Sequence, residues 1–460
     1  MTTEQEIIEI VRQQRLFFNT RGTHAYDFRI DALLKLKAGI KAFENQFRAA
    51  LKEDLGKSEF ESFATETGFV LHDLSVTIKQ LKIWMKPRKA KTPFLCQPAS
   101  SRIHFSPLGV HLIISPYNYP ISLTFAPLTA AIAAGNTAVV KTSELAPFCS
   151  AAIQELIEKT FDPAYVASIS GDVPETTLLL KQQFDHIFFT GSPKVGTIVM
   201  EAAAKHLTPV TLELGGKSPC IVHSDADLPL AVHRIVYGKF MNAGQSCIAP
   251  DYIMVHQSIK EEFLERIRQR IIDQYGVDAS LSPDFGRIVN DRHHSRIVNL
   301  IDQSKVIVGG RFNKLDRYIA PTVMSNVTLA DKVMTEEIFG PVLPVLEYNH
   351  FDEISDVMAK LPQHPLACYI FSESKAVQEE LISRMQFGGG CVNHCMQHFA
   401  NSNLPFGGVG ESGIGSYHGF HGFERFSHKK SILKAATWFD LSLIYPPYKG
   451  KMETLRRILK

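Results

Sequence analysis

A single cysteine among small residues is the strongest candidate for chemistry in this sequence. Cys247 lies in the stretch from Met241 to Pro250, where Gly244 and Ser246 leave room for a substrate to approach the sulfur. A thiolate attacks a carbonyl carbon readily once a neighbouring group lowers the pKa of the thiol or removes its proton. Free cysteine is nevertheless more often a small core residue. The role of Cys247 therefore depends on the groups that the fold brings to it.

Two other segments carry groups that a cysteine nucleophile needs. Glu213 lies just before a pair of glycines, and a glutamate in such a lean, partly apolar setting could act as a general base. Asn118 lies between two prolines that stiffen its loop, and a side-chain amide can hold an oxyanion. These residues are far from Cys247 in the sequence, so the three groups can meet only through tertiary structure.

Two strand-to-helix connections could hold a dinucleotide. The segment 188–196 predicts a strand that leads into a helix flanked by glycines, where backbone N–H groups could meet a phosphate. It is neither a GxGxxG fingerprint nor a phosphate-binding P-loop, so an ordinary connection remains the alternative. Lys141 and Glu144 follow another predicted strand, where they could hold ribose hydroxyls. The alternative for this pair is a solvated surface contact.

Other catalytic classes find little support in the sequence. Cys391, His394 and Cys395 superficially resemble a metal site, but no second pair of ligands occurs at zinc-like spacing. We therefore expect no metal. The sequence also lacks the GxSxG elbow of serine hydrolases.

Composition indicates an ordinary globular protein of two or three domains. The chain has 460 residues, of which 45% are hydrophobic and 21% charged, and its formal net charge is +2. This charge favours neither a nucleic acid nor an anionic membrane as partner. Seven thinly spread cysteines indicate reduced thiols in a cytoplasmic compartment. The sequence has no apolar run of about 18 residues, so we expect no membrane span. The basic tail after Tyr448 predicts a solvated helix, with membrane contact as the minority alternative.

Periodicity places the candidates on alternating strands and helices. Helical spacing prevails over residues 4–89, and the proline-rich stretch 92–107 predicts an extended arm. From Gly109 to Leu214, strands alternate with helices, which predicts a parallel, doubly wound sheet with ligands beyond the carboxyl ends of its strands. A second such region begins near Cys247. In it, a capping box over 258–261 should open a helix, and a last strand is expected over 431–434.

Taken together, these motifs resemble the aldehyde dehydrogenase superfamily along nearly the whole chain. The segments that carry the resemblance occur in the order and spacing of the family, at residues 115–120, 135–147, 188–196, 213–219, 244–250, 336–341 and 404–410. The short N-terminus and the segments 417–419, 426–430 and 445–448 resemble class 3, the dimeric branch that acts on aromatic and fatty aldehydes. The chain lacks the long apolar tail of the membrane-bound relatives.

The resemblance implies an α/β fold with two doubly wound parallel-sheet domains and a small β oligomerisation arm. A dinucleotide-binding domain would comprise residues 1–82 and 107–210, and a catalytic domain residues 211–400. Residues 83–106 and 401–445 would form oligomerisation and bridging segments, and 446–460 a C-terminal tail.

The resemblance also assigns roles. Cys247 would be the nucleophile and Glu213 the hydrolytic base, while Asn118 and the Cys247 N–H would hold the oxyanion. Lys141 and Glu144 would hold the adenosine ribose, Gly191 and Gly196 would flank the pyrophosphate, and Glu337 and Phe339 would position the nicotinamide. Thr190, Ser192, Leu214 and Gly215 complete the expected cofactor set, and the aldehyde tunnel would be lined by Tyr119, Tyr237 and Ser246.

The implied activity is oxidation of medium- or long-chain aliphatic or aromatic aldehydes to acids with NAD, and with NADP accepted, in a homodimer. Tyr237 stands where class 3 relatives can have tryptophan, and Ser246 where threonine is common, so substrate preference stays open. A CoA-acylating or phosphorylating dehydrogenase is the alternative enzyme, and a non-catalytic binding protein on the same fold is the alternative from another class. Glu213 weighs against the first alternative, because transfer to CoA or phosphate needs no hydrolytic base.

Overall fold

The carboxyl edge of a six-stranded sheet carries Glu213. The computed structural model describes residues 2–362 and 364–459. The strand order in this sheet is β17 (Gly413–Ile414), β7 (Val210–Glu213), β6 (His186–Thr190), β3 (Val110–Ile114), β4 (Thr137–Lys141) and β5 (Val166–Ile169). All neighbours are parallel except the pair of β17 with β7. The predicted doubly wound parallel sheet is thus confirmed, and the strand order reverses at β3, between β6 and β4.

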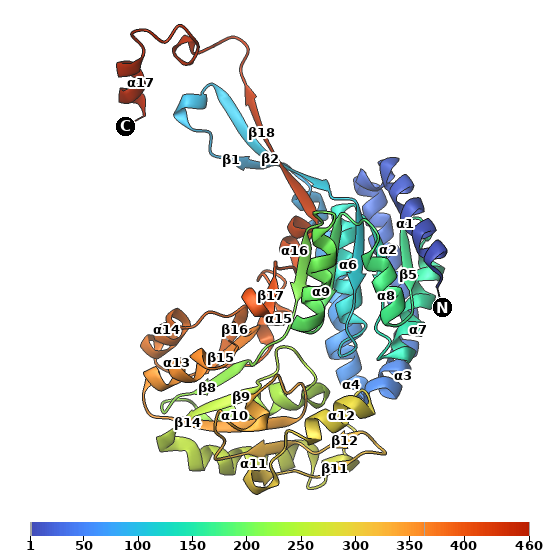
Figure 1. Ribbon diagram of the computed structural model, residues 1–460, viewed down its shortest axis with the longest axis vertical. Helices are drawn as coiled ribbons and strands as arrows, with labels where there is room; N and C mark the ends of the chain where they lie inside the picture. The colour runs from blue at the N-terminus through green and yellow to red at the C-terminus, as the bar shows by residue number, and fades with distance from the viewer. Residues whose placement is uncertain (1, 363, 460) are drawn as a thin grey trace.

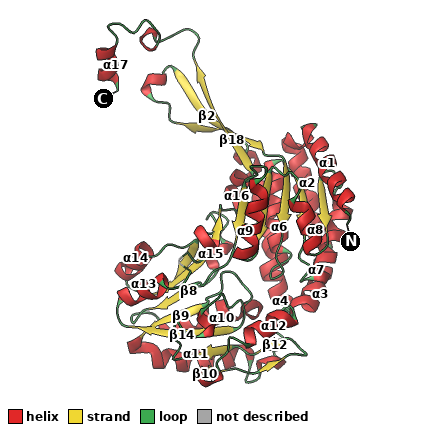
Figure 2. Ribbon diagram, viewed as in Figure 1, coloured by secondary structure: helices red, strands yellow, loops and turns green. Residues whose placement is uncertain are grey.

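Helices flank this sheet, as Figures 1 and 2 show. They are α1 (Glu4–Asn19), α2 (Tyr26–Ala42), α3 (Glu44–Leu55), α4 (Glu59–Ser62), α5 (Gly68–Trp84), α6 (Ser122–Ala134), α7 (Pro147–Thr160), α8 (Val173–Leu180), α9 (Pro193–Ala204) and α16 (Gly419–Arg425). A π-helical segment, η2 (Phe63–Thr67), joins α4 to α5. The strands between them are buried along their whole length or nearly so, which is why they read in the sequence as continuous apolar runs.

A second sheet of seven strands lies beyond the Cys247 segment. Its order is β10 (Val306–Val308), β13 (Thr322–Met324), β14 (Val342–Tyr348), β9 (Tyr252–His256), β8 (Pro219–Val222), β15 (Ala367–Phe371) and β16 (Gly389–Val392). Its strands are parallel except where β10 meets β13. Its helices are α10 (Leu228–Phe240), α11 (Lys260–Tyr275), α12 (Asp291–Val298), α13 (Phe351–Ala359), α14 (Lys375–Arg384) and α15 (Gln397–Ala400), and a short hairpin pairs β11 (Phe312–Asn313) with β12 (Tyr318–Ile319).

The predicted capping box at the start of α11 is wrong. The helix begins at Lys260, after a 3₁₀ turn, and no side chain caps it. The Ser258 hydroxyl instead pairs with Nδ1 of His256 at 2.8 Å. Because that hydroxyl is engaged by the preceding strand end, it does not reach the N–H of Glu261. The helix nevertheless buries an apolar stripe of Phe263, Leu264, Ile267 and Ile271, while Ile272 is half-buried.

A three-stranded antiparallel arm projects from the body (Figure 1). It consists of β1 (Arg88–Ala90), β2 (Ala99–Pro107) and β18 (Ser427–Ala435), and β18 pairs with β2 along nine residues. The predicted strand at 431–434 is therefore longer than expected. The tail ends in an exposed helix, α17 (Met452–Ile458). No helix in the part of the chain that the structure describes is long and apolar enough to cross a bilayer.

The expected domain limits stay a prediction. The first sheet contains all of β7, so the expected boundary at residues 210 and 211 falls inside a strand. β17 and α16, from the expected bridging segment, pack with the first sheet and its helices rather than with the arm alone.

Candidate active site

Cys247 follows a loop with an unusual backbone. Asn242 and Ala243 have φ of 54° and 49°, in the left-handed region that non-glycine residues rarely adopt. At Gly244, where φ is 73°, a Cβ atom would lie 2.3 Å from the carbonyl oxygen of Gly340, so only glycine fits. Strain of this kind persists only where surrounding contacts enforce it. The loop presents Cys247 half-buried rather than sealed in the core.

Hydrogen bonds from outside the loop enforce its shape. The Asn242 amide donates to the backbone oxygen of Gln245 at 3.1 Å and to that of Asn118 at 2.8 Å. The Gln245 side chain donates to the carbonyl of Arg287 at 2.9 Å and accepts from the N–H of Val289 at 3.0 Å. Gln245 is fully buried, so these bonds satisfy polar groups that would otherwise be desolvated without compensation.

The structure brings Asn118 to this loop, as the sequence predicted. Its side-chain amide donates to the backbone oxygen of Gln245 at 3.1 Å, two residues before the sulfur. Asn118 is buried, in the turn between β3 and α6. An amide held in this way is preorganised to meet negative charge on an oxygen next to Cys247.

A buried ion pair fixes the turn that carries Asn118. Lys57 Nζ lies 2.6 Å from Glu66 Oε1, and both side chains are fully buried. Lys57 also donates to the backbone oxygen of Asn118 at 3.0 Å, and its ammonium lies 4.0 Å from the ring centroid of Tyr119. The second oxygen of Glu66 accepts the N–H groups of Ile121 and Ser122 at 3.1 and 2.8 Å, at the start of α6.

Glu213 ends β7 as a buried carboxylate without a hydrogen bond. Neither of its oxygens has a partner among the residues that the structure describes. Burial raises the pKa of Glu213 well above its usual range, and only the guanidinium of Arg425 acts in the opposite direction. Arg425 is itself held by Thr211, whose hydroxyl accepts from its Nε at 2.8 Å. A desolvated, unpaired carboxylate is a stronger base than one in water.

The charge of Glu213 acts on the Cys247 thiol. Burial makes the largest contribution to the raised pKa of the Cys247 thiol, and the carboxyl groups of Glu337 and Glu213 raise it further. The thiol is therefore neutral at rest. Its proton must leave as a bond to carbon forms, and a nearby base is needed to accept it.

Three buried hydroxyls lie where the central strands of the first sheet end. They belong to Ser115 after β3, Thr142 after β4 and Thr190 at the end of β6, and none has a hydrogen-bond partner among the described residues. Beside them, the buried ammonium of Lys141 donates to the backbone oxygen of Thr142 at 2.6 Å and lies 3.7 Å from the half-exposed carboxylate of Glu144. Polar groups left open at a strand-order reversal fit a dinucleotide with hydroxyls and phosphates.

The predicted phosphate residues follow β6 and β7 of the first sheet, and the predicted nicotinamide residues lie in the loop before β14 of the second. Ser192 caps α9 by accepting the N–H of Val195, and a Cβ at Gly196 would meet the side chain of Leu214 at 2.8 Å. A Cβ at Gly215 would lie 2.2 Å from the carboxylate of Glu337. Burial raises the pKa of Glu337 to about 8. The N–H of Gly191 donates a hydrogen bond to the backbone oxygen of Glu213. Phe339 has a φ of 48°, in the left-handed region of the backbone.

A second buried ion pair holds the Glu337 segment in place. Lys217 Nζ lies 2.5 Å from Asp251 Oδ2 and donates to the carbonyls of Val333 and Glu336 at 3.0 and 2.8 Å. The other oxygen of Asp251 accepts the N–H of Ile338 at 3.0 Å. The segment 333–338 is thereby tied to the strand that follows Cys247.

The predicted tunnel residues differ in exposure. Tyr119 and Ser246 are buried, and both the Ser246 hydroxyl and the Cys247 thiol affect the pKa of Tyr119. Tyr237, near the end of α10, is 38% exposed. Glu61, which sequence reasoning missed, is a buried carboxylate close enough to both tyrosines to raise the pKa of each. Burial raises the pKa of Glu61 itself to about 7.

In the sequence, the cysteines at 391 and 395 are the one candidate pair for a metal site. Within the described residues, no cluster of three or more His, Cys, Asp or Glu side chains could hold a metal ion. Cys391 Sγ instead lies 3.5 Å from Nδ1 of His398.

Known proteins resemble this chain along almost its whole length. The model of the aldehyde dehydrogenase family matches residues 1–432. The 4,4′-diaponeurosporen-aldehyde dehydrogenase of Staphylococcus aureus is 44% identical over 448 residues, which cover 97% of each chain. The dimeric NADP-preferring aldehyde dehydrogenase of Rattus norvegicus is 44% identical over 448 residues, which cover 97% of this chain and 99% of that protein.

Solved structures of aldehyde dehydrogenases have the same fold. The substrate-bound structure of Staphylococcus aureus AldH superposes with a TM-score of 0.96 at 43% identity, covering 99% of each chain. An NAD-dependent aldehyde dehydrogenase from Sinorhizobium meliloti superposes with a TM-score of 0.83 at 27% identity, covering 95% of this chain and 89% of that one.

Breaking the buried ion pair should destabilise the protein far more than breaking a surface pair. Lys57→Met leaves the Glu66 carboxylate buried without its cation, which should lower the free energy of unfolding by about 3–5 kcal/mol. The control is Lys159→Met, which removes the solvated pair with Glu155 on α7 and should cost about 1 kcal/mol or less. Thermal and urea unfolding measure both variants. Equal losses in the two variants would contradict the role given to Lys57.

Proposed function

The chain belongs to the aldehyde dehydrogenase family and is an NAD(P)-dependent aldehyde dehydrogenase, and on that premise we propose that Cys247, Glu213 and Asn118 are its catalytic residues. The hydrogen bond from the Asn118 amide to the loop of Cys247 carries this proposal. In addition, the carboxylate of Glu213, which has no hydrogen bond among the described residues, raises the pKa of the Cys247 thiol.

The cysteine begins the reaction. The Cys247 thiol gives its proton to a solvent water molecule as its sulfur forms a bond to the aldehyde carbon, and the π electrons of the carbonyl move to the carbonyl oxygen. The Asn118 amide and the Cys247 N–H stabilise that oxyanion in the thiohemiacetal. When bound, NAD(P)⁺ supplies the hydride acceptor that turns this adduct into a thioester.

Hydrolysis of the thioester is assigned to Glu213. The carboxylate takes a proton from a water molecule as the water oxygen attacks the thioester carbon. The carbon–sulfur bond then breaks and the acid leaves. Glu213 returns its proton to the Cys247 sulfur, so that the carboxylate and the thiol are both restored. Because Glu213 has no hydrogen bond among the described residues, both of its oxygens are free to accept one from a water molecule.

The cofactor would be held along the carboxyl edge of the first sheet. The open hydroxyls of Ser115, Thr142 and Thr190 and the buried ammonium of Lys141 fit the polar groups of a dinucleotide. Glu144 would hold the adenosine ribose, and Gly191, Ser192 and Gly196 would approach the pyrophosphate. Glu337 and Phe339 would orient the nicotinamide, beside Leu214 and Gly215.

The proposed substrate is a medium- or long-chain aliphatic aldehyde or an aromatic aldehyde. It would enter through a tunnel lined by Tyr119, Tyr237 and Ser246. Supporting this class, the Staphylococcus relative is named for 4,4′-diaponeurosporen-aldehyde. Aromatic walls favour apolar chains and rings over small polar aldehydes. Transfer of the acyl group to CoA or phosphate is disfavoured by Glu213, and acid release without either additive distinguishes the two outcomes.

A homodimer is proposed to form through the projecting arm. The edge of β18 and the segment after it carry exposed apolar side chains, among them Leu433 and Trp438, the latter 80% exposed. Such side chains on an antiparallel edge are typical of a covered contact, and the name of the rat relative describes a dimer. The unpaired cysteines favour a cytoplasmic location.

Replacing the nucleophile should abolish turnover. Cys247→Ala leaves no atom to hold the acyl group, so NADH formation with benzaldehyde should fall by roughly 10⁴-fold or more. Cys391→Ala, which removes another half-buried thiol, is the matched control and should keep wild-type turnover. Residual turnover of Cys247→Ala within about tenfold of wild type would overturn the assignment.

Replacing the base should separate the two halves of the reaction. Glu213→Gln should retain the first burst of NADH and lose later turnover by about 10²-fold or more, because only the hydrolytic step needs the carboxylate. Since burial raises the pKa of Glu213, wild-type hydrolysis should speed up with rising pH until the base is ionised. Stopped-flow absorbance at 340 nm measures the burst; its loss would mean that Glu213 mainly activates the thiol.

Cofactor preference should depend on Glu144. A carboxylate beside the ribose favours the 2′-hydroxyl of NAD and repels the 2′-phosphate of NADP, so we expect NAD preferred and NADP accepted. Glu144→Gln should shift the ratio of kcat/KM values toward NADP by about tenfold. Glu158→Gln, at an exposed position on α7, is the control. A clear NADP preference in the wild type would contradict the argument.

A further inference from the structure

The guanidinium of Arg425 reaches the first sheet from the end of α16. Its Nε donates to the Thr211 hydroxyl at 2.8 Å, and its Nη2 donates to the backbone oxygen of Val210. A glycine makes room for it, because a Cβ at Gly415, where φ is 87°, would lie 2.9 Å from Nε. A guanidinium is not deprotonated in proteins. The sheet therefore holds a fixed positive charge at Thr211.

Thr211 and Glu213 point to the same face of β7. Side chains alternate between the two faces of a strand, so residues two apart share a face and lie about 7 Å from one another. On the neighbouring strand β6, Thr211 pairs with Phe188 and Glu213 pairs with Thr190. The Arg425 guanidinium, which is bonded to the Thr211 hydroxyl, is therefore held beside the next side chain on that face, which is the carboxylate of Glu213.

The two charged groups are neighbours without a hydrogen bond between them. Neither oxygen of Glu213 has a partner among the described residues. The Arg425 donors at Nε and Nη2 are engaged by Thr211 and Val210 instead. The Thr211 hydroxyl has a second contact, since Nε2 of His186 lies 2.9 Å from its oxygen. Thr211 is also β-branched, and such side chains have few rotamers. The guanidinium is thus fixed where its charge acts on the carboxylate but its N–H groups do not bond it.

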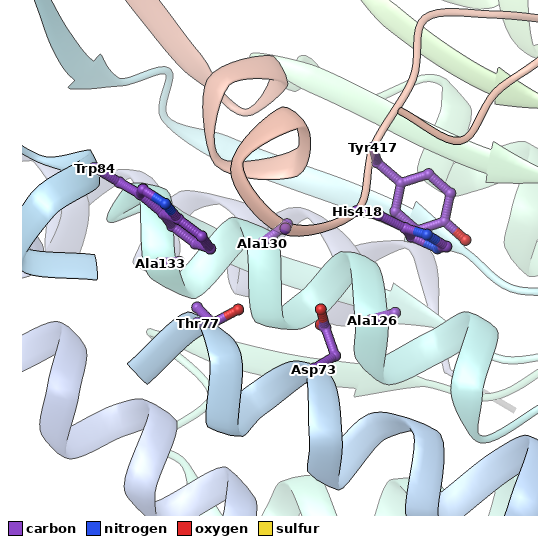
Figure 3. A pocket seen from close by; sticks show the side chains of 9 residues that line it. Asp73, Thr77, Trp84, Ala126, Ala130, Ala133, Tyr417 and His418 are labelled. Atoms are coloured by element: carbon purple, nitrogen blue, oxygen red, sulfur yellow. The ribbon is translucent and has the colours of Figure 1, made fainter. Parts of the chain in front are cut away.

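The other titratable groups on this side of the sheet are neutral. His186 on β6 pairs with His111 on β3, and burial lowers the pKa of both rings. Tyr417, which Figure 3 shows in the segment after β17, packs its ring edge-on against Phe188 of β6. Burial raises the pKa of the Tyr417 phenol and of the Cys247 thiol. Among the described residues, the guanidinium is therefore the charged group that faces the carboxylate.

We propose that Arg425 is a positioning residue for the hydrolytic base, because Thr211 holds its guanidinium beside Glu213 and out of hydrogen-bond contact with it. This inference rests on the proposed role of Glu213. Burial raises the pKa of Glu213 and Arg425 lowers it, so the charge leaves more of the carboxylate ionised at neutral pH. A direct salt bridge would have the same effect, but it would occupy the oxygens that must take a proton from water. The arrangement keeps the base ionised and its oxygens free.

The pH profile of thioester hydrolysis tests the role of the charge. p-Nitrophenyl acetate acylates Cys247, so the burst of p-nitrophenol counts active sites and the steady phase reports hydrolysis at each of them. The steady rate should rise with pH to a plateau as Glu213 ionises. Arg425→Gln should move the midpoint of this rise upward by about one pH unit and keep the plateau, so that the rate at neutral pH falls about tenfold. Arg425→Lys keeps the charge and should keep the midpoint. Arg268→Gln, which removes an exposed charge from α11, is the control and should leave the profile unchanged.

Two threonine variants test the separation of the charged groups. Thr211→Val has a similar shape but lacks the hydroxyl, so the freed N–H of Arg425 should bond the Glu213 carboxylate. The plateau should then fall about tenfold without a rise of the midpoint, because a bonded carboxylate accepts a proton from water less readily. Thr211→Ser restores the hydroxyl and should restore the plateau.

Several results would overturn this role. A midpoint of Arg425→Gln equal to that of wild type would exclude an effect of the charge, and an equal fall of the rate at every pH would mean that Arg425 only supports the fold. An unchanged plateau or a higher midpoint in Thr211→Val would contradict the separation, and this variant decides the matter should Arg425→Gln fail to fold. Failure of the proposed function is distinct, because Glu213→Gln would then keep the wild-type profile.

Discussion

The active site depends on a charge pair that is sealed inside the protein. Lys57 and Glu66 are fully buried 2.6 Å apart, and burial of two charges costs several kcal/mol unless their remaining hydrogen-bonding groups are satisfied. Here the backbone around Asn118 satisfies them. Lys57 donates a hydrogen bond to the Asn118 carbonyl, and Glu66 accepts hydrogen bonds from two N–H groups at the start of α6. The charges therefore hold the amide that faces Cys247 in one orientation, and a looser attachment would leave the proposed oxyanion site to thermal averaging.

A second buried ion pair fixes another loop of the site. Lys217 and Asp251 are also buried, and their spare hydrogen bonds bind the backbone of residues 333–338, which precede and include Glu337. Two lysines thus anchor two loops that come from distant parts of the chain. Between these anchors the Cys247 loop can keep left-handed residues at 242 and 243, since its neighbours leave it no relaxed alternative. Rigidity around the site is what allows strain within it.

Much of the site could be predicted from sequence because its functional groups lie in short motifs with glycine or proline beside them. Cys247, Glu213 and Asn118 stand out in this way. The fold joins the Asn118 amide to the Cys247 loop, and the roles of the three residues stay a prediction. Lys57 and Glu66 carry no such signature, since a lysine in a loop and a glutamate nine residues later are usually exposed to solvent. Only tertiary burial distinguishes them. The Ser258 pattern failed for the opposite reason, because a local motif was overridden by a hydrogen bond to His256.

Glu213 shows how this fold divides its polar groups between rigidity and reactivity. The lysine-paired carboxylates, Glu66 and Asp251, are each held by an ammonium and by at least one backbone N–H group. Glu213 is equally buried, yet the part of the chain that the structure describes gives its oxygens no donor, and its nearest cation, Arg425, is engaged by Thr211. A carboxylate kept free in this manner costs stability, because its charge is desolvated without compensation. In the proposed mechanism this cost has a use, because an unpaired carboxylate can activate a water molecule for hydrolysis of the thioester.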